Sequence, residues 1–194
     1  MRYSDTHKDE TRKKVVRAAA AAVRSKGPEG VGVAEIMAAA GLTHGGFYAH
    51  FPSKEALIVA AIDEAFGSSA RRFARLTDGA SRREALATFV DTYVTMRHRD
   101  HPEGGCPVAT LSSDLPRQGL AVREAYERGL KSLVRRVAGW LPEATPDPDS
   151  VAASLVAEMA GSVLIARAIS DDAEADRLLA DARHRIKHRM GILT

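Results

Sequence analysis

The chain has 194 residues, 45% of them hydrophobic and only 5% aromatic, a composition that provides a core and favours helices over strands. The single cysteine, Cys106, excludes an internal disulfide. The polar segment 1–14 excludes a secretory signal, and no apolar run approaches the roughly 20 residues of a membrane span. We therefore expect a cytoplasmic protein without membrane contact. The net charge of +3 is unevenly spread: nine Lys/Arg against five Asp/Glu give +4 over residues 1–54, and nineteen against twenty give −1 over the remainder. The positive excess of residues 1–54 is too small for a non-specific DNA-compacting protein.

Three helices are predicted in the first quarter of the chain. Apolar residues recur at four-residue spacing over 11–26, and Gly27 followed by Pro28 ends that helix. A short helix over 34–40 ends at Gly41. Thr43 is then a suitable N-cap for another short helix over 44–50.

The remainder of the chain is also predicted to be helical. Ser53 caps a helix expected to reach about residue 76, and Ser81 with Glu84 forms a capping box for the next helix, whose apolar face extends to Met96. Residues 101–107 form a loop, followed by a broken helical stretch over 108–115. Further helices are expected over 120–141, 150–170 and 171–190. The fold class is therefore all-α, with about nine helices.

The segment 33–54, VAEIMAAAGLTHGGFYAHFPSK, predicts a helix-turn-helix. Gly45 and Gly46 each cost a helix roughly 1 kcal/mol relative to alanine, so the pair indicates close approach of another backbone, and DNA is the candidate. Phe47 and Phe51 would hold the helix against the core. The alternative for the glycine pair is tight packing against the first helix.

Several polar side chains around this helix are placed to reach DNA. Tyr48, His44 and His50 are expected to face outward, and Lys54 lies beside the backbone N–H groups that open the next helix. The two histidines could equally be surface or capping residues. The expected DNA-binding residues are Thr43, His44, Gly45, Gly46, Tyr48, His50 and Lys54.

The run Thr-His-Gly-Gly-Phe-Tyr-Ala-His-Phe-Pro-Ser-Lys-Glu-Ala-Leu, starting at Thr43, resembles the signature of the TetR/AcrR family of bacterial regulators. The resemblance begins at Thr11-Arg12 and covers about the first third of the chain. It implies a three-helix DNA-binding domain, here 1–54, and a helical domain for ligand binding and dimerisation, here 55–194. Val33 departs from the family pattern, since a Ser or Thr often stands there to cap the helix and contact phosphate.

Apolar and aromatic residues of the second domain are candidates for an effector cavity, although side chains at helical spacing are more often plain core. Cys106 also lies within Gly-Cys-Pro, which resembles a stretch in some electrophile-responsive members of the family. A buried, unreactive cysteine is the alternative. The expected ligand-binding residues are Phe89, Tyr93, Met96, Cys106, Leu111, Tyr126 and Met159.

The last two predicted helices are expected to form a two-fold dimer. Small residues on the first of them allow close packing of helices in a four-helix interface. The residues expected to supply apolar area to the dimer interface are Leu155, Met159, Ile186 and Met190.

Together these features predict a repressor that binds an inverted-repeat DNA operator as a homodimer and is released by a small-molecule effector. The alternative is a helical enzyme with Cys106 as nucleophile and His98 or His101 as base, which leaves the segment 43–54 unexplained. We expect no cofactor and no metal site, because His98 and His101 have no further ligand clustered with them.

Overall fold

A computed structural model describes residues 2–193 and contains only helices over that range. Nine of them are α-helices and three are short 3₁₀ segments, which agrees with the all-α class. Their bounds are α1 Arg2–Lys26, α2 Val33–Ala39, η1 His44–Ala49, α3 Lys54–Leu76, α4 Arg82–Tyr93, α5 Met96–Asp100, η2 Pro102–Gly104, α6 Pro107–Leu111, η3 Leu115–Arg117, α7 Leu120–Ala138, α8 Pro148–Ala168 and α9 Asp172–Arg189.

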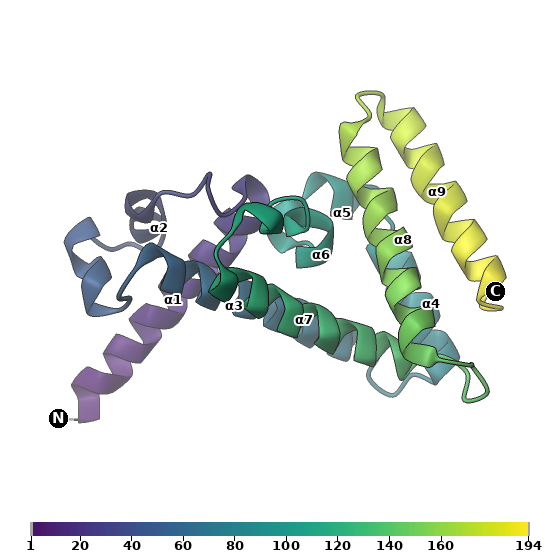
Figure 1. The fold of residues 1–194 in the computed structure, drawn as a ribbon, viewed down its shortest axis with the longest axis horizontal. Coiled ribbons are helices and arrows are strands. Elements are labelled where there is room, and N and C mark those ends of the chain that lie inside the picture. The colour runs from purple at the N-terminus through teal and green to yellow at the C-terminus, as the bar shows by residue number, and fades with distance from the viewer. Residues whose placement is uncertain (1, 194) are drawn as a thin grey trace.

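The molecule is elongated, with α2 and η1 at one end and the α8–α9 pair at the other (Figure 1). Helices α3 and α7 lie against each other between the two ends. One core lies among α1, α2, η1 and the first half of α3, and extends to α6 and the start of α7. A second core lies among α4, α8, α9 and the end of α3. Helix α3 therefore contributes to both cores, and the expected domain boundary at 54/55 falls at its first turn.

Two helix bounds differ from the sequence prediction. Helix α1 starts at Arg2 rather than near Thr11. The helix predicted to run through Met96 ends at Tyr93, because Thr95 begins a new helix by accepting a hydrogen bond from the backbone of His98 at 3.2 Å. The predicted capping box of α4 is confirmed.

Helix α8 is long and apolar enough to cross a membrane by length and composition alone. Asp149, Glu158 and Arg167 interrupt its apolar residues, so the helix contains no uninterrupted apolar run of that length. Its side chains instead pack into the second core, where Leu155, Val156, Met159 and Val163 are buried. Packing into this core accounts for the buried apolar side chains of α8, whereas Leu164 and Ile165 remain exposed.

Candidate nucleic-acid interface

The turn between α2 and η1 is set by Gly41. Its φ of 74° lies in the left-handed region, which glycine adopts without steric cost. The chain then reverses, and Leu42 donates its backbone N–H to the Met37 carbonyl at 2.9 Å. Thr43 has the extended backbone of an N-cap, yet its side chain makes no capping hydrogen bond. Its exposed hydroxyl is therefore free to meet an outside partner.

Two phenylalanines anchor η1 as predicted. Phe47 and Phe51 are each 1% exposed, and their rings stack with centroids 5.8 Å apart. The guanidinium of Arg12 lies 4.8 Å from the centroid of the Phe51 ring, so α1 also holds this segment in place. The short helix predicted over 44–50 is present as a 3₁₀ helix. Two glycines in its first turn are consistent with this weaker helical geometry.

The outward face of η1 carries the side chains that the sequence predicted there, with one exception. Tyr48 is 74% exposed, and His44 is exposed as well. His50 is only half exposed, and its ring Nδ1 is buried without a hydrogen-bond partner in the described part of the chain. The expectation that His50 faces outward is corrected to this extent, because His50 ends η1 at the point where the chain turns inward to Phe51.

Nothing in the protein itself requires glycine at the start of η1. A Cβ added to Gly45 would meet no atom within 4 Å, and one added to Gly46 would meet only the end of Met37, from α2, at 3.7 Å. Tight packing against α1 is therefore not the reason for the pair. The hypothesis that an external backbone approaches the pair closely is left for an experiment to test.

Lys54 opens α3 beside the same surface. Ser53 caps the helix by accepting a hydrogen bond from the backbone of Ala56 at 3.0 Å. The exposed ammonium group of Lys54 thus lies next to a helix N-terminus, an arrangement that suits a phosphate.

The expected ligand residues fall into two groups. Phe89, Tyr93, Cys106 and Met159 are buried together in the second core, with Met96 packed against it. Leu111 is buried in the first core, and Tyr126 packs against that core. The seven residues therefore belong to two packed cores. A cavity of about 240 Å³ between α3 and α7 includes none of them.

His98 joins this second core to the loop before α6. Its Nδ1 donates to the Tyr93 carbonyl at 2.8 Å, and its Nε2 accepts from the backbone N–H of Cys106 at 2.9 Å. Burial, aided by the charges of Arg167 and Arg72, lowers the pKa of His98 to about 4 despite the opposing bond to Tyr93. Both ring nitrogens are thus engaged with backbone, and the imidazole is neutral.

The enzyme alternative lacks its catalytic pair. Cys106 is 4% exposed, and burial raises the pKa of its thiol, so the reactive thiolate is disfavoured. His98 contacts the backbone N–H of Cys106 and has no free nitrogen to act as a base. His101 is exposed and pairs with Glu103. Among the described residues no cluster of three or more potential metal ligands is found.

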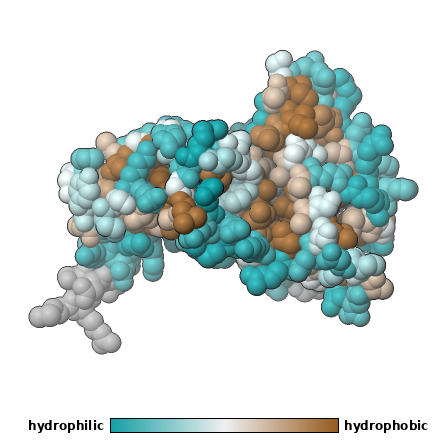
Figure 2. All heavy atoms as spheres, viewed as in Figure 1, coloured by the Kyte–Doolittle hydropathy of each residue, from teal (hydrophilic) through white to brown (hydrophobic). Residues whose placement is uncertain are grey.

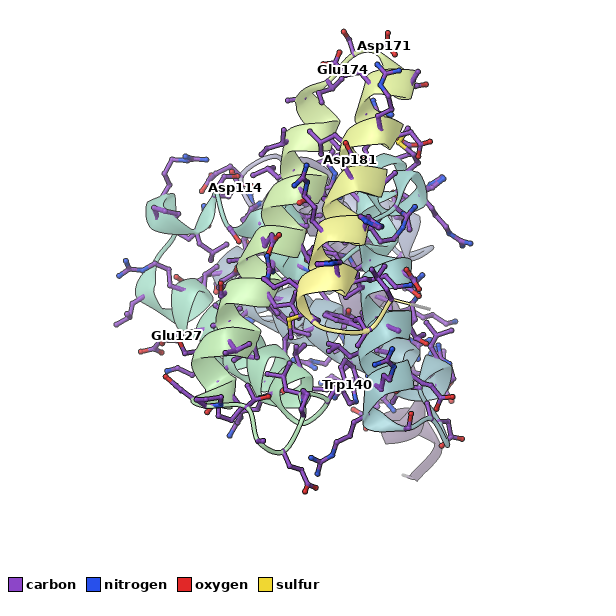
Figure 3. The ribbon with its side chains drawn as sticks, turned by 90° about the vertical axis from the view of Figure 1, so that its right-hand side faces the viewer. Asp114, Glu127, Trp140, Asp171, Glu174 and Asp181 are labelled. Atoms are coloured by element: carbon purple, nitrogen blue, oxygen red, sulfur yellow. The ribbon has the colours of Figure 1, made fainter. Side chains whose placement is uncertain are left out.

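The residues expected at the dimer interface lie mostly inside one protomer. Leu155, Met159 and Ile186 are at most 1% exposed, and Met190 packs against the same core. The exposed apolar side chains of α8 are instead Leu164 and Ile165. Figure 2 shows apolar atoms gathered over this part of the molecule. Figure 3 shows α8 and α9 side by side, with Glu174 and Asp181 along α9.

Arginines that no sequence motif indicates join separate helices in the second domain. Arg99 and Arg167 each donate to backbone carbonyls on the other's helix, and neither lies in a recognisable motif. Arg24 is also buried, between α1 and α3, where its Nη1 donates to the Ala65 carbonyl at 3.3 Å. A lone arginine within an otherwise apolar helical face is the only signal that the sequence offers for such roles.

Comparisons with known proteins agree with this architecture. Residues 15–61 match the model of "Bacterial regulatory proteins, tetR family", and residues 82–182 match that of "Tetracyclin repressor-like, C-terminal domain". The second match alone covers more than half of the chain. A search of curated proteins gave no match.

Solved structures of similar fold come from several bacteria. A TetR transcriptional regulator from Chloroflexus aurantiacus is 27% identical, with a TM-score of 0.80 and 96% of each chain covered. A TetR-family regulator from Cytophaga hutchinsonii is 22% identical, with a TM-score of 0.78, covering 94% of this chain and 96% of that one. The reduced form of E. coli NemR is 20% identical, with a TM-score of 0.77, covering 92% and 96%. With both of its halves matched and a helix-turn-helix carrying an outward tyrosine, the chain belongs to the TetR family of bacterial transcriptional regulators.

Proposed function

We propose that the protein is a cytoplasmic repressor that binds an inverted-repeat operator as a homodimer and leaves it when a small molecule binds. The observation that carries the proposal is the form of η1, where buried Phe47 and Phe51 hold an exposed Tyr48 outward. A large exposed tyrosine on a rigidly held segment is suited to contact a phosphate or a base edge. We assign DNA binding to domain 1–54 and ligand binding and dimerisation to domain 55–194.

The DNA contacts that we propose follow the exposure of the side chains. Tyr48, Thr43 and Lys54 would contact phosphates, and His44 would contact a phosphate or a base edge. The backbone at Gly45 and Gly46 would approach the DNA closely, because no Cβ stands in between. His50 would contribute less, since it is half-buried.

The proposed dimer uses the outward face of α8 together with α9. Leu164 and Ile165 are 49% and 56% exposed, and Ala153, Ala157 and Ala168 on the same helix are exposed small residues that allow close approach. The buried Leu155, Met159 and Ile186 would support this face from behind. A two-fold axis through it would place two η1 segments on successive major-groove faces.

Selection of bound sequences from a random DNA pool tests the proposal. The expected result is an inverted repeat whose half-sites lie about one helical turn, or a multiple of it, apart. A single unsymmetrical motif, or no enriched sequence, would contradict it. Ile165→Glu should yield monomers by light scattering and lose the inverted repeat, whereas Leu120→Glu, at an exposed leucine on α7, should remain dimeric.

The effector is proposed to bind in the second domain beside Tyr93 and Cys106. Its effect on DNA binding is limited to its differential affinity for the free and DNA-bound conformations, typically about 1–3 kcal/mol of coupling. By reciprocity, an inducer binds the free protein more tightly than the operator complex. Helix α3, which enters both cores, is suited to carry the change.

A further inference from the structure

A polar groove of about 490 Å³ opens where α3, the α4–α5 junction and η2 meet. Its volume is within the range of about 300–1,000 Å³ typical of small-molecule sites. It lies over the core that holds Tyr93 and Cys106, because His98 forms one wall and contacts the Tyr93 ring at 4.6 Å between centroids. The side chains that give the groove its polarity are Arg72, Arg97, His101, Glu103, Thr92 and Thr95.

The groove has more positive than negative groups. Glu103 is the only carboxylate among its lining residues, and it already pairs with His101 at 3.2 Å. Arg72 is half-buried and forms no ion pair or side-chain hydrogen bond within the described residues, whereas the neighbouring Arg71 pairs with Glu64 at 2.7 Å. A half-buried guanidinium without a partner gains most from an anion that it can bind through two N–H groups.

The charge of Arg72 acts on the side of the groove that His98 forms. Burial, then the charge of Arg167 and then that of Arg72 lower the pKa of His98, which places Arg72 within electrostatic range of the groove wall that His98 forms. His98 itself offers no donor to a ligand, because both ring nitrogens are engaged with backbone. The charged donors available in the groove are therefore Arg72 and Arg97, with two threonine side chains nearby.

We propose that this groove binds a small oxyanion, a carboxylate or phosphate group, with Arg72 and Arg97 as its charged donors. This oxyanion would be the chemical group by which the protein recognises its effector, and that part of the inference rests on the proposed regulatory function. Neither arginine was among the ligand residues expected from the sequence.

The position of the groove explains how the anion would act on DNA binding. Segment η2, which provides Glu103 and Gly104 to the groove, packs against α1 of the DNA-binding domain. Arg24, near the end of α1, is buried and donates to the Ser68 hydroxyl at 3.3 Å, while its Nε has no partner in the described part of the chain. An anion that shifts η2 would therefore change how α1 packs against the rest of the protein.

Binding is tested on the free protein without DNA, so that the outcome is independent of operator recognition. The probes are inorganic phosphate and acetate, each titrated at constant ionic strength while thermal unfolding is followed. An anion that binds only the folded state raises Tm in a saturable way. We expect this for at least one probe, and the arm that responds identifies the oxyanion.

Arg72→Gln removes the proposed donor, and Arg71→Gln is the matched control, since it removes a charge at the adjacent position on a different groove. We expect about a tenfold weaker response in Arg72→Gln and an unchanged one in Arg71→Gln. If Arg72→Gln does not fold, Arg97→Gln, at an exposed position, takes its place. No response to either probe, or equal responses in the wild type and Arg72→Gln, would overturn the proposal while leaving DNA binding untouched.

Discussion

Arg99 and Arg167 cap each other's helices. Arg99 donates from Nε to the carbonyl of Ala166 and from Nη2 to that of Ile169, both at 2.9 Å, at the end of α8. Arg167 donates from Nε to the Arg99 carbonyl at 3.0 Å and from Nη2 to the His98 carbonyl at 2.8 Å, at the end of α5. The last carbonyls of a helix have no partner within it, so each arginine satisfies the other's helix end. This fixes α5 against α8 and holds one side of the region that we propose for the effector.

Arg167→Lys is expected to destabilise the fold. A lysine ammonium cannot reproduce the planar fork of the guanidinium, so at least one partly buried carbonyl loses its donor, at a cost of about 1–3 kcal/mol. Urea unfolding followed by circular dichroism measures the change. Arg177→Lys, at an exposed position on α9, is the control and should stay within about 0.5 kcal/mol of the wild type. Equal stability of the two variants would show that the reciprocal caps contribute little.

His98 predicts an acid-sensitive fold. Burial lowers the pKa of His98 from its ordinary 6.5 to about 4, so between these values the unfolded state binds more protons than the folded one. Stability is therefore unaffected by this group above pH 6.5 and falls as the pH drops from 6.5 towards 4. At about 1.4 kcal/mol per pH unit, the loss approaches roughly 3 kcal/mol.

Urea unfolding at a series of pH values measures this loss. His98→Gln keeps an acceptor for the Cys106 N–H but cannot titrate, so its stability should be lower at pH 7 and less dependent on pH below 6.5. His101→Gln, which removes an exposed imidazole three residues away, is the control. A wild-type pH profile in His98→Gln would show that another group is responsible.

Much of the fold was predictable because its determinants are local. The capping box of Ser81 and Glu84 and the glycine turn at Gly41 are set by residues a few positions apart, and both are present. The break before Thr95 was missed, because the apolar spacing continues through Met96 although the helix does not.

The sequence alone does not show which face of α8 is buried and which is exposed. Leu155 and Leu164 lie in a helix that is apolar on most sides, and only the position of its neighbours decides that the first is buried and the second exposed. The buried and exposed sides of η1 were easier to predict, since Phe47 and Phe51 fix its inner side by their spacing. The groove at Arg72 joins residues from separate helices, and no local pattern indicates it.

Gly45→Ala distinguishes two explanations for this glycine, close approach of the DNA backbone and packing within the protein. A Cβ at this position meets no atom of the protein within 4 Å, so thermal stability should be unchanged or slightly higher. If the backbone approaches DNA here, affinity for the selected operator should fall by about tenfold, which corresponds to about 1.4 kcal/mol. Fluorescence anisotropy with labelled operator measures it. Wild-type affinity in a normally folded variant would remove the DNA explanation for this glycine.

Lys54→Ala tests the proposed phosphate contact beside η1. A lost phosphate contact should weaken binding to all sequences to a similar extent and reduce the slope of log affinity against log salt by about one. Anisotropy titrations at several salt concentrations give this slope. Lys131→Ala, at an exposed lysine of α7, is the control and should keep the wild-type slope. An unchanged slope in Lys54→Ala would show that Lys54 contacts no phosphate.

The proposed repressor recognises a particular DNA sequence as a dimer. The most direct test of this recognition compares the affinity of the wild-type protein for the selected operator with that for a scrambled duplex of the same length at physiological salt. Specific binding predicts at least about a thousandfold preference for the operator, with two protomers bound to each inverted repeat. Equal affinity for the two duplexes would show that the protein does not recognise the operator sequence.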